Sequence, residues 1–218
     1  MQSASAMRNG TPALAFPAMS MRVAVCISGS GSNLAALLAA FPRGSEVDIA
    51  LVISSRRSAG GLGHAEAHGV PAVILGDPAD PAQWLGPLEQ HGIELLVLAG
   101  FLRLVPPAVI ERYQGRILNI HPGPLPEFGG PGMYGERVHA AVLAAGLAET
   151  RASVHLVDEA YDRGEVLASV PVPVHPGDTA ATLAARVLAV EHRLLPAVVR
   201  AAARAGRPVP LSETPTQE

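Results

Sequence analysis

The chain has a single cysteine, Cys26, which lies in the apolar run V-A-V-C-I-S. One cysteine cannot form a disulfide within the chain or supply a cysteine-rich zinc cluster. Free cysteine is usually buried, so we expect Cys26 to be an inert residue of the hydrophobic core.

Charge is also scarce, and neither sign dominates. Charged residues make up 16% of the 218 residues, and the formal net charge is -3. A protein that binds a nucleic-acid backbone neutralises its phosphates with clustered basic residues. We therefore expect no nucleic acid as a partner, although small anions could bind at local sites.

Long hydrophobic runs are missing as well. A membrane span needs about 18 apolar residues, but the run at 93–107 is interrupted by Arg103 and ends in two prolines. Residues 1–20 lack the basic start and continuous apolar block of a signal peptide. We expect a soluble, cytoplasmic protein with no membrane association and a disordered N-terminal extension over 1–20.

What remains is the composition of a globular protein. Hydrophobic residues make up 49% of the chain, which is far from the low hydrophobicity and high charge of disordered segments. A chain of this length suits one sizeable core. We predict a single domain over 21–207, followed by a loose tail over 208–218.

Short runs of consecutive apolar residues alternate with helical patterns in the first half of the domain. Strands buried on both faces of a sheet have such runs, which occur here at 21–27, 47–54, 70–75, 93–99 and 116–120. Helices are expected between them, at 33–40, 60–68, 81–91 and 106–113. This alternation predicts an α/β fold with a doubly wound, mostly parallel, Rossmann-like sheet and helices on both faces.

The pattern changes after residue 120. A Gly/Pro-rich loop at 121–133 and a helix near 134–146 precede two apolar runs, 152–158 and 166–174, with turn-forming residues between them. These runs predict a C-terminal antiparallel hairpin added to the sheet.

A long amphipathic helix is expected to follow the hairpin. Asp178 or Thr179 is a suitable N-cap, and Pro196 lies within the helical pattern. Because proline cannot donate the helical hydrogen bond, we expect the helix to be bent or broken there.

A Gly/Ser loop, I-S-G-S-G-S-N at 27–33, joins the first strand to the first helix. Glycine allows close approach of a ligand, and Ser32, Asn33 and free helix amides could bind an anion. Leu34 occupies the third glycine position of a dinucleotide fingerprint, and no lysine completes a P-loop. Binding of NADP through the arginines of S-S-R-R (54–57), and a glycine turn without a ligand, remain as alternatives.

The segment N-I-H-P places Asn119 and His121 at the end of the fifth apolar run. In extended chain both side chains lie on one side, where two hydrogen-bond donors could stabilise an oxygen that becomes negative during acyl transfer. The alternative is a loop-capping asparagine and a structural histidine.

Carboxylates gather in the turn of the predicted hairpin, at Asp158, Glu159, Asp162 and Glu165. A carboxylate that reaches His121 would favour its protonated form. The alternative is a solvated acidic turn, since aspartate is common in turns.

Metal ligands are not expected. The pair His64 and His68 resembles a helical zinc pair, but the metalloprotease motif has glutamate directly after the first histidine. We interpret His91, His139 and His175 as structural or surface residues.

Three motifs occur in a specific order: G-S-G-S-N (29–33), N-I-H-P (119–122), and S-V-H-L-V-D (153–158) followed by Asp162. Together with 98–107, 133–142, 172–179 and 191–196, they resemble the phosphoribosylglycinamide formyltransferases. Members of that family transfer a formyl group from 10-formyltetrahydrofolate to the amine of glycinamide ribonucleotide in de novo purine biosynthesis. The resemblance implies these two small molecules as partners, no metal, and a monomer or homodimer.

The resemblance also implies roles for individual residues. The ribonucleotide would be bound through its phosphate by Gly31, Ser32 and Asn33 and near its ribose by Glu191. The folate pocket would comprise Leu102, Arg103, Leu104, Val105, Asn119, Asp158, Glu159, Ala160, Tyr161 and Asp162. Asn119, His121 and Asp162 would form a catalytic trio, with Asp162 keeping His121 protonated.

The sequence departs from the family at three places. Residues 76–100 contain no Arg or Lys, whereas members often carry an arginine there that helps to hold the folate tail. Residues 123–126 read G-P-L-P instead of S-L-L-P, and 162–165 read D-R-G-E instead of D-x-G-P. The competing hypotheses are a formyltetrahydrofolate hydrolase, another folate-dependent formyltransferase such as the one acting on methionyl-tRNA, and a catalytically silent nucleotide-binding module.

Overall fold

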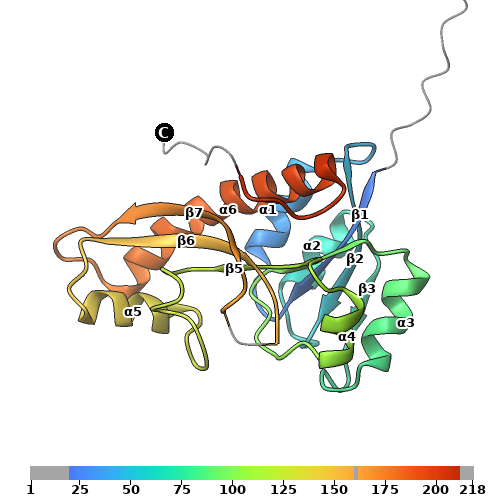
Figure 1. Ribbon diagram of the computed structural model, residues 1–218, viewed down its shortest axis with the longest axis horizontal. Coiled ribbons are helices and arrows are strands. Elements are labelled where there is room, and N and C mark those ends of the chain that lie inside the picture. The colour runs from blue at the N-terminus through green and yellow to red at the C-terminus, as the bar shows by residue number, and fades with distance from the viewer. Residues whose placement is uncertain (1–19, 160–161, 212–218) are drawn as a thin grey trace, which may run out of the picture.

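The computed structural model describes residues 20–159 and 162–211. A seven-stranded sheet runs through the molecule in the order β3-β2-β1-β4-β5-β6-β7 (Figure 1). Its strands are β1 (Met21–Ile27), β2 (Val47–Ser54), β3 (Ala72–Ile74), β4 (Leu95–Leu98), β5 (Ile117–His121), β6 (Glu149–Leu156) and β7 (Val166–Pro173). Strands β1 to β5 pair in parallel, and β6 and β7 are antiparallel. The predicted fold, including the added hairpin, is confirmed.

Helices cover both faces of the sheet. They are α1 (Ser32–Ala40), α2 (Gly61–Ala67), α3 (Ala82–Gln90), α4 (Pro107–Arg112), α5 (Glu136–Ala144) and α6 (Ala180–Ala205). Helices α1, α2, α5 and α6 contribute to one core cluster, and α3 and α4 contribute to the other. Figure 1 shows α1 and α6 together on one side of the strands and α3 and α4 on the opposite side.

Strand β1 explains why the apolar runs are continuous. Val23 and Val25 face the core under α1 and α6, whereas Ala24 and Cys26 face the core under α3 and α4. Because successive side chains point to opposite faces, a strand with helices on both sides needs apolar residues at every position. Cys26 is fully buried, as predicted, and burial raises the pKa of its thiol well above the usual range.

Helix α6 is continuous through Pro196, so the predicted break does not occur. It begins with a capping box between Thr179 and Thr182 and ends at Gly206, which has a φ of 69°. Proline removes one helical hydrogen bond, but buried residues before and after it, such as Leu183 and Val198, pack into the same core cluster. This packing stabilises both halves of the helix.

Ordered contacts also continue past residue 207, where the tail was predicted to begin. Pro208 is buried, and the amide of Leu211 donates to the carbonyl of Leu167 in β7 at 3.0 Å. The rest of the predicted tail, and all but Ser20 of the predicted N-terminal extension, lie outside the described residues.

The order of the strands places a crevice at the carboxyl ends of β1 and β4. The chain proceeds from β1 outward to β2 and β3, then returns to the other side of β1 with β4 and β5. Ligands of doubly wound sheets bind where the strand order reverses in this way.

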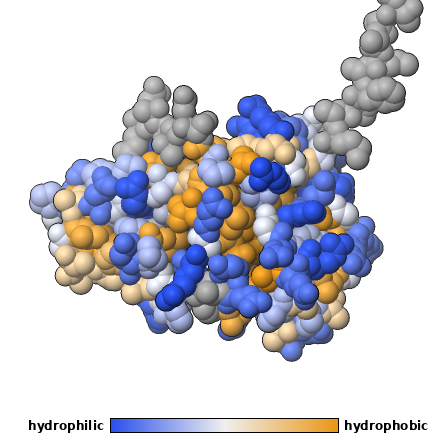
Figure 2. Space-filling view, viewed as in Figure 1, coloured by the Kyte–Doolittle hydropathy of each residue, from blue (hydrophilic) through white to orange (hydrophobic). Residues whose placement is uncertain are grey.

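In Figure 2, hydrophobic side chains form a band across the middle of the visible face, between hydrophilic regions. None of the described helices is long and apolar enough to cross a bilayer.

Candidate active site

A cavity of about 1400 Å³ opens at the carboxyl ends of β1, β4 and β5. Every described residue predicted for the ribonucleotide, the folate or the chemistry lines it: Gly31, Ser32, Asn33, Leu102, Arg103, Leu104, Val105, Asn119, His121, Asp158, Glu159, Asp162 and Glu191. Ala160 and Tyr161 lie outside the described residues. The structure therefore brings together side chains from separate segments of the sequence.

The pairing of β5 with β6 sets a polar residue of β6 beside each of Asn119 and His121. Asn119 lies opposite His155, and His121 lies opposite Ser153. Side chains directly opposite in an antiparallel pair face the same side of the sheet. His155 was missed by the sequence reasoning, although it lies in the S-V-H-L-V-D motif and alternates with Ser153 as Asn119 does with His121.

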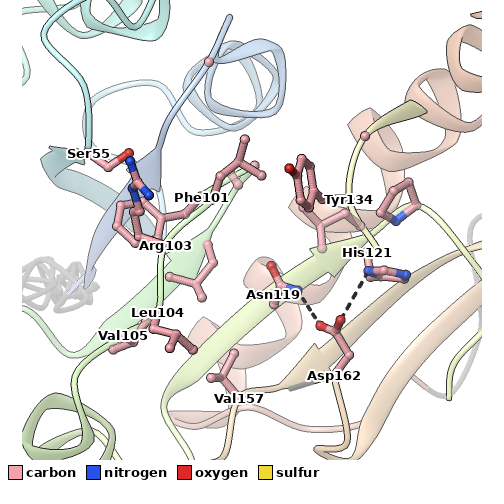
Figure 3. Close-up of a pocket in the computed structure, with 18 of the residues that line it drawn as sticks. Ser55, Phe101, Arg103, Leu104, Val105, Asn119, His121, Tyr134, Val157 and Asp162 are labelled. Atoms are coloured by element: carbon pink, nitrogen blue, oxygen red, sulfur yellow. Dashed lines mark hydrogen bonds and ion pairs between the residues drawn. The ribbon is translucent and has the colours of Figure 1, made fainter. Parts of the chain in front are cut away.

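Asp162 projects into the site from the turn after β6. Its φ of 51° is left-handed, a conformation that aspartate tolerates better than most residues. One oxygen, Oδ2, accepts a hydrogen bond from the Gly130 amide at 2.8 Å and lies 3.9 Å from Nδ1 of His121 (Figure 3). Burial acts to raise the pKa of Asp162, but the neighbouring His155 ring, the hydrogen bond from the Gly130 amide and the charge of His121 hold it below its usual value.

His121 is buried, and its other nitrogen is also engaged. Nε2 lies 2.9 Å from the carbonyl oxygen of Phe128. A carbonyl oxygen only accepts, so Nε2 carries a hydrogen. Burial lowers the pKa of His121, and this effect outweighs the opposing effect of Asp162. Asp162 thus favours the protonated ring, while burial favours the neutral ring more strongly, so the pKa of His121 lies below its usual value.

The amide of Asn119 turns its nitrogen toward the other polar groups. Nδ2 lies 3.0 Å from Nε2 of His155 and 3.5 Å from Oδ1 of Asp162. Figure 3 shows the Asn119 nitrogen directed at Asp162. The side chains of Asn119, His155 and Asp162 thus lie in mutual contact.

At one end of the cavity, the Gly/Ser loop leads into α1, which begins at Ser32. The first amides of a helix have no partners within the helix and attract anions. Asn33 donates from Nδ2 to the buried Glu191 at 2.7 Å, while its own Oδ1 is buried without a hydrogen-bond partner. Burial raises the pKa of Glu191 to about 7, although the bond from Asn33 acts in the opposite direction.

Another part of the cavity wall is the loop after β4, which carries exposed apolar side chains. Leu102 is 41% exposed and Leu104 is 61% exposed. The amide of Leu102 donates to Oγ of Ser28 at 2.8 Å, and Ser28 shares a second hydrogen bond with Ser55 at 2.6 Å. The loop is therefore tied to the ends of β1 and β2, with its leucines open to the cavity.

Gly123, the first departure from the family in the loop after His121, fills a position with no room for a side chain. A Cβ there would lie 2.5 Å from Cγ1 of Val138 and 3.4 Å from Nε2 of His121. The carbonyl oxygen of Gly123 accepts a hydrogen bond from Oγ of Ser153 at 3.0 Å. Glycine allows α5 to approach the ring of His121.

His139, which we interpreted as structural or surface, lies in the wall of the same cavity. It is buried, and its Nδ1 has no hydrogen-bond partner. Burial, together with the nearby charge of His121, lowers the pKa of His139 to about 4. No pattern in the sequence distinguishes it, because its position depends on how α5 packs.

Comparison with known proteins shows which family this domain resembles. The family model described as "Formyl transferase" matches residues 21–199. The chloroplastic phosphoribosylglycinamide formyltransferase of Vigna unguiculata is 39% identical over 187 residues, which cover 83% of this chain and 60% of the relative. The Arabidopsis thaliana relative of the same name is 38% identical over 83% of this chain and 64% of its own length. The chain thus spans less than two thirds of these plant relatives.

Two solved structures share the fold. Phosphoribosylglycinamide formyltransferase from Anaplasma phagocytophilum has a TM-score of 0.80 at 36% identity, with 85% of this chain and 87% of that chain covered. Formyltetrahydrofolate deformylase from Pseudomonas syringae pv. tomato has a TM-score of 0.77 at 25% identity, with 87% of this chain but 63% of that chain covered.

Proposed function

Because the chain belongs to the formyl transferase family, we propose that it transfers the formyl group of 10-formyltetrahydrofolate to the amine of glycinamide ribonucleotide. The observation that carries the proposal is a cavity in which a helix N-terminus, the neighbouring side chains of Asn119, His121 and Asp162, and an apolar loop meet. Such an enzyme serves de novo purine biosynthesis. The names of the similar enzymes support the same reaction.

The end of the cavity near α1 suits a phosphorylated ribose. The helix N-terminus offers amides to the phosphate, and Ser32 and Asn33 add side-chain polar groups. Glu191 is placed beside Asn33, where a carboxylate can accept hydrogen bonds from ribose hydroxyls. The unsatisfied Oδ1 of Asn33 is a further acceptor for a bound hydroxyl.

The part of the cavity lined by the loop after β4 suits the fused ring and the tail of a folate. Leu102 and Leu104 are exposed apolar residues that an aromatic ring system would cover. Within the described residues, Arg103 is the only arginine that lines the cavity, and the sequence has no lysine. Figure 3 shows Arg103 directed toward Ser55, away from Asp162.

The reaction would take place between the two bound molecules, at Asn119, His121 and Asp162. The neutral amine forms a bond to the formyl carbon, and the carbonyl electron pair moves to oxygen to give a tetrahedral oxyanion. Asn119 donates a hydrogen bond to this oxyanion, and His121 does so once protonated, with Asp162 stabilising its charge. The attacking nitrogen loses a proton, the bond to the folate nitrogen breaks, and that nitrogen takes up a proton.

A turnover assay with purified protein, glycinamide ribonucleotide and 10-formyltetrahydrofolate tests this proposal. We expect formylated ribonucleotide and tetrahydrofolate in equal amounts. The variant Asn119→Ala should lose about 100-fold to about 1,000-fold in kcat, as expected when one oxyanion donor is removed. Arg204→Ala is the matched control, since this side chain is 72% exposed at the end of α6.

Two other outcomes would favour the competing functions. Formate release that does not require the ribonucleotide would support a deformylase, whose solved relative shares the fold. Ribonucleotide binding by folded protein, with no product from either reaction, would support a silent binding module.

A further inference from the structure

His155 is a buried imidazole that contacts two of the three proposed catalytic residues. It lies in β6 and is 1% exposed. Its Nε2 lies 3.0 Å from Nδ2 of Asn119 and 3.4 Å from Oδ1 of Asp162. Its Nδ1 lies 2.8 Å from the carbonyl oxygen of Leu156. Both ring nitrogens are thus engaged within the site.

The contact with Leu156 determines which nitrogen carries the hydrogen. A backbone carbonyl oxygen can only accept, so Nδ1 is the donor. In the neutral ring Nε2 then has a free lone pair, which accepts a hydrogen from Nδ2 of Asn119. In the neutral ring His155 is therefore an acceptor toward the site, and it can donate to Oδ1 of Asp162 at 3.4 Å only when both ring nitrogens carry a hydrogen.

This acceptor selects one of the two orientations of the Asn119 amide. If the amide were rotated by half a turn, its oxygen would face the lone pair of His155 and the carboxylate of Asp162. Both contacts would then be repulsive. His155 and Asp162 together keep the nitrogen, with its two hydrogens, on the inner side.

The two hydrogens of Nδ2 are held unequally. The contact with His155 is 3.0 Å, a normal hydrogen-bond length, whereas that with Asp162 is 3.5 Å, beyond the usual range. The second hydrogen is therefore available to an oxygen atom in the cavity.

We propose that His155 is a positioning residue that anchors one hydrogen of the Asn119 amide and thereby presents the other to the formyl oxygen of the substrate. This inference rests on the proposed formyl transfer. His155 acts through Asn119 and does not touch the reacting atoms.

Two variants of His155 separate positioning from packing. His155→Gln places an amide oxygen near the position of Nε2 and can still accept from Asn119. His155→Asn is the matched control, since it reproduces the donor at Nδ1 toward Leu156 but cannot reach Asn119. We expect His155→Asn to lose about 10-fold to about 100-fold in kcat, because a misplaced donor forfeits much of its contribution, and His155→Gln to recover most of that loss.

The KM for the ribonucleotide should change little in both variants, because His155 contacts Asn119, Asp162 and Leu156 and none of the residues proposed to bind the phosphate and ribose. In an Asn119→Ala background, His155→Asn should cost less than about 2-fold, since residues that act through one another are not additive. Equal kcat values for His155→Gln and His155→Asn would overturn the inference. So would a loss of kcat for His155→Asn that is as large in the Asn119→Ala background as in the wild-type protein.

Nitrogen-15 NMR of the imidazoles in the wild-type protein provides a test that needs neither a folded variant nor turnover. We expect the tautomer of His155 with hydrogen on Nδ1, and a hydrogen on Nε2 of the neutral ring would contradict the proposed contact. An inactive wild-type protein would refute the proposed function instead, so the two failures are distinguishable.

Discussion

The variant Asp162→Asn removes the charge of Asp162 and, if the side-chain oxygen stays on Gly130, places an amide nitrogen where Oδ1 faces Asn119. Oδ2 of Asp162 accepts the Gly130 amide at 2.8 Å, and an asparagine oxygen can keep this bond. The same oxygen lies 3.9 Å from Nδ1 of His121, and the Asp162 side chain is 12% exposed. We therefore expect a folded protein in which the support for a protonated His121 is lost.

The distance sets the size of the effect. Two unit charges about 4 Å apart interact by about 1 kcal/mol in water and by about 4 kcal/mol at the effective dielectric typical of proteins. Asp162 is mostly buried, so the loss should lie between these limits. Since about 1.4 kcal/mol is a factor of ten, kcat should fall by about 5-fold to about 700-fold.

The pH dependence has a definite sign. Burial lowers the pKa of His121 and Asp162 raises it, so removal of the carboxylate lowers the pKa further. If protonated His121 stabilises the oxyanion, the alkaline limb of the kcat profile moves to lower pH in Asp162→Asn. The measurement is kcat and KM from acidic to alkaline pH, with thermal unfolding as the control for folding. An unchanged kcat, or an alkaline limb that stays in place, would refute the role assigned to Asp162.

Two further predictions concern stability and fit. Glu191 has a pKa raised from 4.5 to about 7, so its contribution to the free energy of unfolding is complete below pH 4.5 and is lost as pH rises through 7. The free energy of unfolding should therefore fall by about 3 kcal/mol over this pH range. Urea unfolding at several pH values should show this fall in the wild-type protein but not in Glu191→Gln. The KM for the ribonucleotide should be higher in the variant. Gly123→Ala should destabilise the protein by about 1 to about 3 kcal/mol through overpacking against Val138. In a Val138→Ala background, Gly123→Ala should destabilise the protein less. An equal destabilisation in both backgrounds would contradict this steric account.

The parallel part of the fold follows from the sequence because burial on both faces leaves a visible pattern. Strand β1 lies between the two helix layers, and the run from Met21 to Ile27 is apolar throughout except for Arg22. Local patterns could not show that α6 continues through Pro196 or that Pro208 is buried. Both depend on tertiary packing, which the order of residues along the chain does not reveal.

The candidate site was only partly accessible from the sequence. Asn119 and His121 stand out because two polar side chains follow an apolar run, and the family motifs add Asp162. His155 becomes a candidate only with the register of β5 against β6, which a sequence does not contain. The protonation of His121 depends on a competition between burial and the charge of Asp162, and its outcome requires the actual geometry.

The position of Asp162 depends on how closely the backbone of its turn approaches β6, rather than on side-chain packing. Two residues later, a Cβ on Gly164 would overlap the carbonyl oxygen of Leu156, at the end of β6. Glycine therefore lets the turn fold back onto the strand that carries His155. This close return brings the carboxylate within reach of both His121 and Asn119. The replacement of the family's proline by Glu165 leaves this contact intact, because the Leu156 amide still donates to the Glu165 carbonyl at 2.9 Å. The D-x-G part of the turn, rather than the residue after it, is what the geometry of the trio requires.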